Sequence, residues 1–267
     1  MPDEETTPTP VTVLLVCTGN ICRSALGEGL GRAYLGQVLG PAAADLDLVS
    51  AGTRAVVGSG MHPDSALVLS GFGGDPAGFA ARQLEPRMIA GADLVLTLTR
   101  DHRRDVLGLV PRALARTFTL REAADLLEAL DDRVPPGEGF AGRARELVAA
   151  LAAARPGRTG GACDDIPDPI GRPLAEHEEV GQAVAEALLP VLAALVSLHP
   201  ATDGAEVPDP VGRASHVDRS GGSLPAADRS REGTSVRAGS GDGRSTAPPR
   251  ASRSPFGAFT RRRRGGS

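Results

Sequence analysis

Four short runs of aliphatic and β-branched residues occur in the first half of the chain, each bounded by small or polar residues. The first, VTVLLV, is apolar at nearly every position, without the alternation of a half-exposed strand. Such runs are typical of strands that are buried on both faces of a parallel sheet. We therefore predict strands at residues 11–16, 47–53, 92–99 and 115–120.

Segments with helical spacing of apolar residues alternate with these strands and follow the last of them. In the first such segment, Leu26, Leu30 and Leu35 lie on one helical face despite several internal glycines. We expect helices over 24–39, 62–73, 100–109, 121–130, 141–154 and 175–198. This alternation predicts an α/β fold, a three-layer sandwich in which a four-stranded parallel sheet carries helices on both faces.

Composition divides the chain into three parts. Residues 1–10 form a polar lead, and 200–267 are rich in Gly, Ser, Pro and Arg without apolar periodicity. Because such a tail buries too little apolar surface to offset its ordering entropy, we predict that both ends are disordered. The single folded domain is expected at 11–199.

Charge and cysteine content narrow the class of protein. All 29 basic residues are Arg, and the net charge is −4. A final run of four arginines at 261–264 is read as a solvated segment, so we expect no nucleic-acid partner. The N-terminus is acidic, and we find no apolar stretch of about 18 residues, so we expect no membrane span. Three cysteines, an odd number, argue against a disulfide framework and for a cytoplasmic protein with reactive thiols.

The stretch CTGNICRS, residues 17–24, carries the clearest chemical signal. It joins the first strand to the first helix, at the carboxyl edge of the sheet, where ligands of such folds bind. A loop in this position directs backbone N–H groups and a helix N-terminus toward an anion. The guanidinium of Arg23 matches two phosphate oxygens, and the positive surroundings favour the thiolate of Cys17. We therefore predict a phosphate-binding loop with Cys17 as nucleophile, and with these loop residues around the substrate: Thr18, Gly19, Asn20, Ile21, Cys22 and Ser24.

Displacement at phosphorus also requires an acid that protonates the leaving oxygen. The segment PDPIG, residues 167–171, supplies Asp168 between two prolines that stiffen the loop. A near repeat, PDPVGR at 208–213, offers Asp209 as a second candidate. We favour Asp168 because it lies between predicted helices of the folded domain, whereas Asp209 lies in the tail.

These motifs together resemble the low-molecular-weight protein tyrosine phosphatases of bacterial type. The resemblance rests on CTGNICRS, SAGT at 50–53, ADLVLTLTRDH at 92–102 and DPIG before a final helix, and it covers about residues 11–198. It implies catalysis by Cys17, Arg23 and Asp168 without metal or other cofactor. It also implies a reversible disulfide between Cys17 and Cys22.

The resemblance implies a hydrolase that removes phosphate from tyrosine in proteins through a phosphocysteine intermediate. A phosphotyrosine-bearing protein is then the partner, with a bacterial tyrosine kinase as the specific candidate. The chain departs from the family in having Ile170 and Gly171 where an aromatic often lines the pocket. The wall is therefore expected to be aliphatic or to use Phe72 or Phe79.

Three alternatives remain open. Protein arginine phosphatases also resemble this sequence, although they tend to carry Thr where this chain has Ile21. Arsenate reductases of the same fold use two further cysteines downstream, whereas Cys163 stands alone. A non-catalytic phosphate-binding module is the third.

The five histidines show no metal-ligand spacing and are expected to be surface or capping residues.

Overall fold

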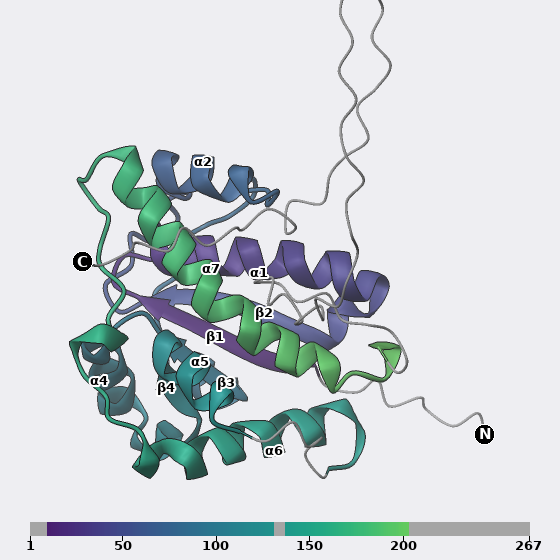
Figure 1. The fold of residues 1–267 in the computed structure, drawn as a ribbon. Helices are drawn as coiled ribbons and strands as arrows, with labels where there is room; N and C mark the ends of the chain where they lie inside the picture. The colour runs from purple at the N-terminus through teal and green to yellow at the C-terminus, as the bar shows by residue number, and fades with distance from the viewer. Residues whose placement is uncertain (1–9, 131–136, 203–267) are drawn as a thin grey trace, which may run out of the picture.

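The structure, a computed structural model, describes residues 10–130 and 137–202. The predicted lead and tail, Asp209 included, lie almost entirely outside this range. The sheet contains β1 (Val11–Cys17), β2 (Leu46–Gly52), β3 (Leu94–Thr97) and β4 (Thr117–Thr119). All pairings are parallel and the order is β2-β1-β3-β4, as Figure 1 shows. The predicted four-stranded parallel sheet is therefore confirmed.

Helices cover both faces of this sheet. One buried cluster joins the sheet to α1 (Arg23–Leu39), α2 (Pro63–Gly71), α5 (Leu120–Glu128), α6 (Gly139–Ala154) and α7 (Leu174–Ser197). A smaller cluster on the other face involves α3 (Pro86–Gly91) and α4 (Arg100–Leu109). Sequence patterns did not predict α3 or the short 3-10 helices at Gly40–Asp45, Pro111–Arg116, Arg155–Gly157, Ala162–Asp164 and Pro200–Thr202. The three layers follow from alternating strand side chains: Val13 and Leu15 face one cluster, Leu14 and Val16 the other.

Glycines in α1 permit close packing around the central strand. A Cβ on Gly31 would lie 2.1 Å from Leu48 Cδ2, and one on Gly29 would lie 2.4 Å from Leu69 Cδ2. These residues weaken the helix intrinsically, but they let it approach β2 and α2 closely. The packing holds the start of α1, and with it the phosphate-binding loop, against the sheet.

The final helix corrects one expectation. Among the described residues, α7 alone is long and apolar enough to cross a membrane by length and composition. Its most apolar window is nevertheless 61% buried inside the protein, where it packs beside α1, α2 and α5. Figure 1 shows it lying alongside α1 over the sheet. The chain therefore does contain one apolar segment of that length, and in this structure it is a core helix.

Candidate active site

The loop between β1 and α1 is held by its neighbours in the sheet. The carbonyls of Cys17, Thr18 and Gly19 accept backbone hydrogen bonds from the segment that follows β2. A Cβ on Gly52 would lie 2.4 Å from the Thr18 carbonyl oxygen, so a residue without a side chain is needed at this approach. The loop is thus fixed by backbone contacts as well as by its own sequence.

Asn20 organises the interior of this loop. Its φ of 54° is the only positive value at a non-glycine residue in the described part of the chain. Its amide Nδ2 donates to Ser24 Oγ at 2.9 Å and to Ser50 Oγ at 2.7 Å, while its Oδ1 accepts from the Arg82 amide at 2.8 Å. Because the side chain is fully buried, these bonds offset the strain of the left-handed backbone.

Two polar groups contact the sulfur of Cys17. Ser24 Oγ lies 2.9 Å from this sulfur, and the Asn20 amide donates to it at 3.3 Å. Cys17 itself is almost fully buried at the carboxyl end of β1.

Arg23 connects the loop to the segment that carries Asp168. It is 4% exposed, donates from Nη1 to the Ile166 carbonyl at 3.1 Å, and forms an ion pair with Asp168. Its Nε is buried and has no hydrogen-bond partner. A buried cationic donor without a partner suits an anionic ligand, since leaving it unpaired is costly.

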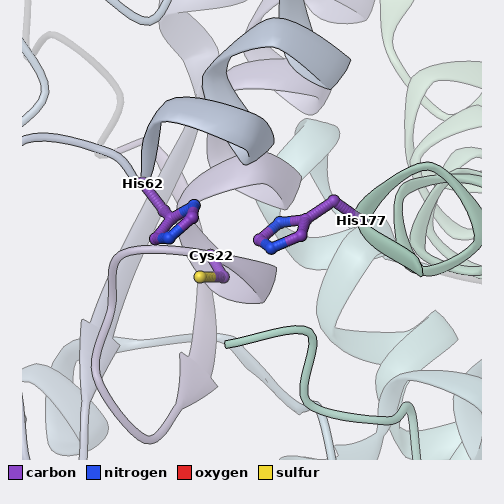
Figure 2. Close-up of side chains that lie close together, drawn as sticks. All are labelled: Cys22, His62 and His177. Atoms are coloured by element: carbon purple, nitrogen blue, oxygen red, sulfur yellow. The ribbon is translucent and has the colours of Figure 1, made fainter. Parts of the chain in front are cut away.

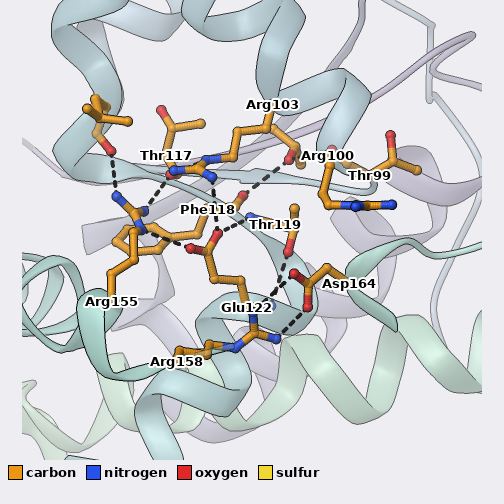
Figure 3. A network of polar contacts seen from close by, with 12 residues as sticks. Thr99, Arg100, Arg103, Thr117, Phe118, Thr119, Glu122, Arg155, Arg158 and Asp164 are labelled. Atoms are coloured by element: carbon orange, nitrogen blue, oxygen red, sulfur yellow. Dashed lines mark hydrogen bonds and ion pairs between the residues drawn. The ribbon is translucent and has the colours of Figure 1, made fainter. Parts of the chain in front are cut away.

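A network of Arg–carboxylate pairs anchors the segment that precedes Asp168, and Figure 3 shows its centre. Arg158 pairs with Asp164, and Arg155 Nε donates to Glu122 at 2.8 Å. Hydrogen bonding from Arg158 lowers the pKa of Asp164. Glu122 closes a capping box with Thr119 at the start of α5. Because Arg158 also pairs with Asp125 of α5, Asp164 is tied to a helix that the sequence places far from Asp168.

The next residues continue this anchoring toward the phosphate-binding loop. Asp165 accepts from the Arg100 amide at 2.8 Å and pairs with its side chain, which lowers the pKa of Asp165. The Ile166 amide then donates to the Leu98 carbonyl at 2.9 Å, directly after the end of β3. Asp168 is 42% exposed and its Oδ1 accepts from the Ile170 amide at 3.2 Å. The acid therefore stands at the rim of the site on a braced loop.

His102 is a site residue that the sequence did not reveal. Its Nε2 lies 2.8 Å from Thr18 Oγ1, and its Nδ1 lies 2.9 Å from Thr99 Oγ1. Burial, and then the charge of Arg23, lowers the pKa of His102 to about 4. The ring is therefore neutral at physiological pH and supports the loop through hydrogen bonding. A single histidine near the start of a helix carried no signal of this contact.

The histidines correct a second expectation. His102, His177 and His199 are buried, rather than on the surface. His62 has the expected capping role at the start of α2, and His199 Nδ1 accepts from the Ala201 amide at the start of the 3-10 helix Pro200–Thr202. His216 lies outside the described residues. His62 and His177 stack with ring centroids 4.7 Å apart, beside the buried thiol of Cys22. Burial raises the pKa of Cys22 to about 11, so its free thiol is protonated at neutral pH.

The rim of the site is aliphatic. Val56, Val57 and Ile170 are the exposed large apolar residues near it, and the Val56 amide donates to the Gly19 carbonyl at 3.0 Å. Phe72, in contrast, is buried in the main core and does not form a pocket wall. The second expected possibility, Phe79, is half-buried.

Comparison with known proteins identifies the class that this fold and loop define. Residues 12–136 match the family described as low molecular weight phosphotyrosine protein phosphatase. The low molecular weight protein-tyrosine-phosphatase Etp of Escherichia coli (strain K12) is 33% identical over 107 residues, which are 40% of this chain and 67% of Etp. The chain therefore belongs to the low molecular weight protein-tyrosine-phosphatase family, and it is a phosphatase.

Solved structures agree on the fold. The tyrosine phosphatase amsI of Erwinia amylovora has a TM-score of 0.50 at 22% identity, covering 71% of this chain and 95% of amsI. The YwlE arginine phosphatase of Geobacillus stearothermophilus has a TM-score of 0.50 at 24% identity, covering 68% and 91%. At these identities the likeness concerns the fold alone. The matched family region ends before Asp168, so the place of that residue rests on its contacts in the structure.

Proposed function

We propose that this phosphatase hydrolyses phosphotyrosine in proteins through a phosphocysteine intermediate on Cys17. The observation that carries the proposal is that Asp168, from a distant part of the chain, meets the loop that holds both Cys17 and Arg23. The Cys17 sulfur contacts Ser24 Oγ and the Asn20 amide, the Arg23 guanidinium of the same loop is buried, and Asp168 contacts that guanidinium. A nucleophile, an anion clamp and a proton donor are the groups that phosphoryl transfer to cysteine requires.

In the first step, the Cys17 thiolate attacks phosphorus while Arg23 and the loop amides hold the other phosphate oxygens. The new S–P bond forms as the bond from phosphorus to the tyrosine oxygen breaks. Asp168, protonated at this stage, gives its proton to the departing oxygen, so that tyrosine leaves as a neutral phenol. Arg23 stabilises charge on the transferring group throughout.

In the second step, Asp168 acts as a base. It takes a proton from water, whose oxygen attacks phosphorus and displaces the Cys17 thiolate. The products are inorganic phosphate and the enzyme with a protonated acid. Ser24 Oγ, 2.9 Å from the sulfur, is placed to stabilise the departing thiolate.

The aliphatic rim supports binding of an aromatic ring next to the phosphate. Val56 lies beside the loop, and Ile170 follows Asp168 by two residues, so apolar side chains border the site from two directions. The aryl ring of a substrate can bury apolar surface against these aliphatic side chains, so an aromatic side chain in the wall is not required. Free cysteines support a reducing, cytoplasmic location. The partner that we propose for this activity is a bacterial tyrosine kinase.

The test is phosphate release from a phosphotyrosine peptide and a phosphoarginine peptide, by wild type and by Cys17→Ser, without added metal. We expect release from phosphotyrosine in the wild type and none in the variant. Release from phosphoarginine alone would assign the chain to arginine phosphatases and refute the argument from Ile21. A folded protein that releases phosphate from neither peptide would overturn the proposed substrate.

A further inference from the structure

Three potential metal ligands converge behind the phosphate-binding loop. Cys22 comes from the loop, His62 from the start of α2 and His177 from α7, and Figure 2 shows their side chains pointing toward one another. One ligand atom from each lies within 4.8 Å of the ligand atoms of the other two. Cys22 and His177 are buried, while the His62 side chain is 25% exposed and leaves an approach from solvent.

One nitrogen in this cluster lacks a partner. His177 Nε2 has no hydrogen-bond partner, and water cannot readily replace one because the side chain is only 1% exposed. The other ring nitrogen, Nδ1, lies 2.9 Å from Ser65 Oγ. That bond fits a proton on Nδ1 and a lone pair on Nε2, the arrangement of a metal-binding imidazole oriented by a hydrogen bond from its second nitrogen.

We propose that Cys22, His62 and His177 form a binding site for Zn²⁺. One sulfur and two imidazole nitrogens are a donor set that this ion prefers. In a tetrahedral zinc site these donors lie about 3.3–3.6 Å apart, so small side-chain rotations suffice to close the cluster. On binding, the Cys22 thiol loses its proton to solvent as its sulfur bonds the metal.

We assign the fourth position of the proposed site to Asp64, whose carboxylate lies beside the two histidines. Its Oδ2 lies 3.9 Å from His62 Nδ1 and 3.9 Å from His177 Nε2. His62 gives up little by rotating toward the ion, because its Nδ1 accepts only a long bond, 3.3 Å, from the Asp64 amide. A thiolate and a carboxylate then balance the two charges of the ion.

The position of the site suggests a consequence for catalysis, and this part rests on the proposed function. Cys22 lies directly before Arg23, and His177 lies in the first turn of α7, the helix that follows the loop of Asp168. A bound ion would therefore connect the phosphate-binding loop to the loop of the proposed acid. We expect zinc at this site to lower turnover of an aryl phosphate, and a chelator to restore it.

The test measures metal binding without relying on activity. The reduced full-length chain is titrated with Co²⁺, followed by absorption, and with Zn²⁺, followed by calorimetry. We expect one ion per chain and a thiolate-to-cobalt charge-transfer band. His62→Asn, which keeps a capping acceptor, and His177→Gln should each weaken zinc binding at least ~100-fold, and Cys22→Ser should remove the band.

Control variants separate this site from the other thiols. Cys17→Ser and Cys163→Ser should retain the band and the affinity, whereas Ser65→Ala should weaken zinc binding about 10–100-fold by freeing His177. A band that disappears in Cys17→Ser and persists in Cys22→Ser would place the ion on the proposed nucleophile and overturn the site. Absence of binding by the folded wild type at micromolar Zn²⁺ would also overturn it. Neither result bears on phosphotyrosine turnover, which is measured separately in the presence of chelator.

Discussion

The carboxylate of Asp168 forms an ion pair with the guanidinium of Arg23, although 145 residues of chain separate them. The pair joins the proposed proton donor directly to the proposed phosphate clamp. A phosphate held by Arg23 would compete with this carboxylate for the same donors, because both are anions that match the guanidinium fork. Release of Asp168 from Arg23 would thus accompany substrate binding and leave the acid at the rim, near the leaving oxygen.

Replacement of Asp168 separates its role as proton donor from its competition with phosphate for Arg23. Asp168→Asn should lower kcat for phenyl phosphate by about 10²–10⁴, because no proton reaches the leaving oxygen. The loss should be smaller for nitrophenyl phosphate, whose leaving group needs less protonation. Inorganic phosphate should inhibit the variant more strongly, since a neutral amide competes less for Arg23. Asp209→Asn is the matched control from the repeated PDPVGR segment and should change none of these values; the reverse ranking would refute the assignment.

Asn20 tests whether the loop depends on backbone geometry or on side-chain bonds. Asn20→Gly keeps access to the left-handed backbone but loses the bonds to Ser24, Ser50 and the Arg82 amide. We expect it to cost about 1–3 kcal/mol in the free energy of unfolding and to reduce turnover. Asn20→Ala should cost about 1 kcal/mol more, because alanine also resists a positive φ. Urea denaturation measures both, and equal stability of the two variants would show that φ is unimportant here.

Gly52→Ala should distort the loop from behind. The added methyl group would lie 2.4 Å from the Thr18 carbonyl oxygen and 3.0 Å from Ala55 Cα, and backbone atoms cannot move aside as a side chain can. We expect a loss of about 1–3 kcal/mol in stability together with reduced turnover. Gly36→Ala on α1 is the control, because nothing lies within 4 Å of its added Cβ. That variant should be neutral or slightly more stable, since alanine favours a helix.

The buried His102 predicts a pH dependence of stability. Its pKa is about 4 in the folded protein, lowered by burial and by Arg23, and returns to about 6.5 on unfolding. Between these values the unfolded chain binds more protons, so stability rises with pH and is lost as the pH falls from 6.5 to 4. We expect this residue to account for about 3 kcal/mol of that loss.

Comparison of the wild type with His102→Gln isolates the contribution of His102 to the pH dependence of stability from the contributions of the carboxylates. Unfolding by urea at pH 7, 6, 5 and 4 should show a shallower decline for the variant than for the wild type. Parallel declines would mean that the ring already titrates normally in the folded protein.

Much of this architecture was predictable because its determinants are local. Short runs rich in aliphatic and β-branched residues indicated all four strands, and the change from the first run to CTGNICRS located the loop at the carboxyl edge of the sheet. The first helix was expected despite its internal glycines, and the structure shows that Gly29 and Gly31 permit close packing there. Helix α3 was missed because six residues around Ile89 are too few to display a helical period.

The sequence by itself determined the family, the succession of strands and helices along the chain, and the loop that carries Cys17 and Arg23. Each of these depends on neighbouring residues. Tertiary structure alone decided which distant groups meet there. It brought Asp168 to Arg23, His102 to Thr18, and His177 to Cys22, contacts between segments whose spacing along the chain carries no trace of their proximity. The physical reason is that the parallel sheet gathers the carboxyl ends of its strands at one edge. Residues from unrelated positions therefore share one small volume.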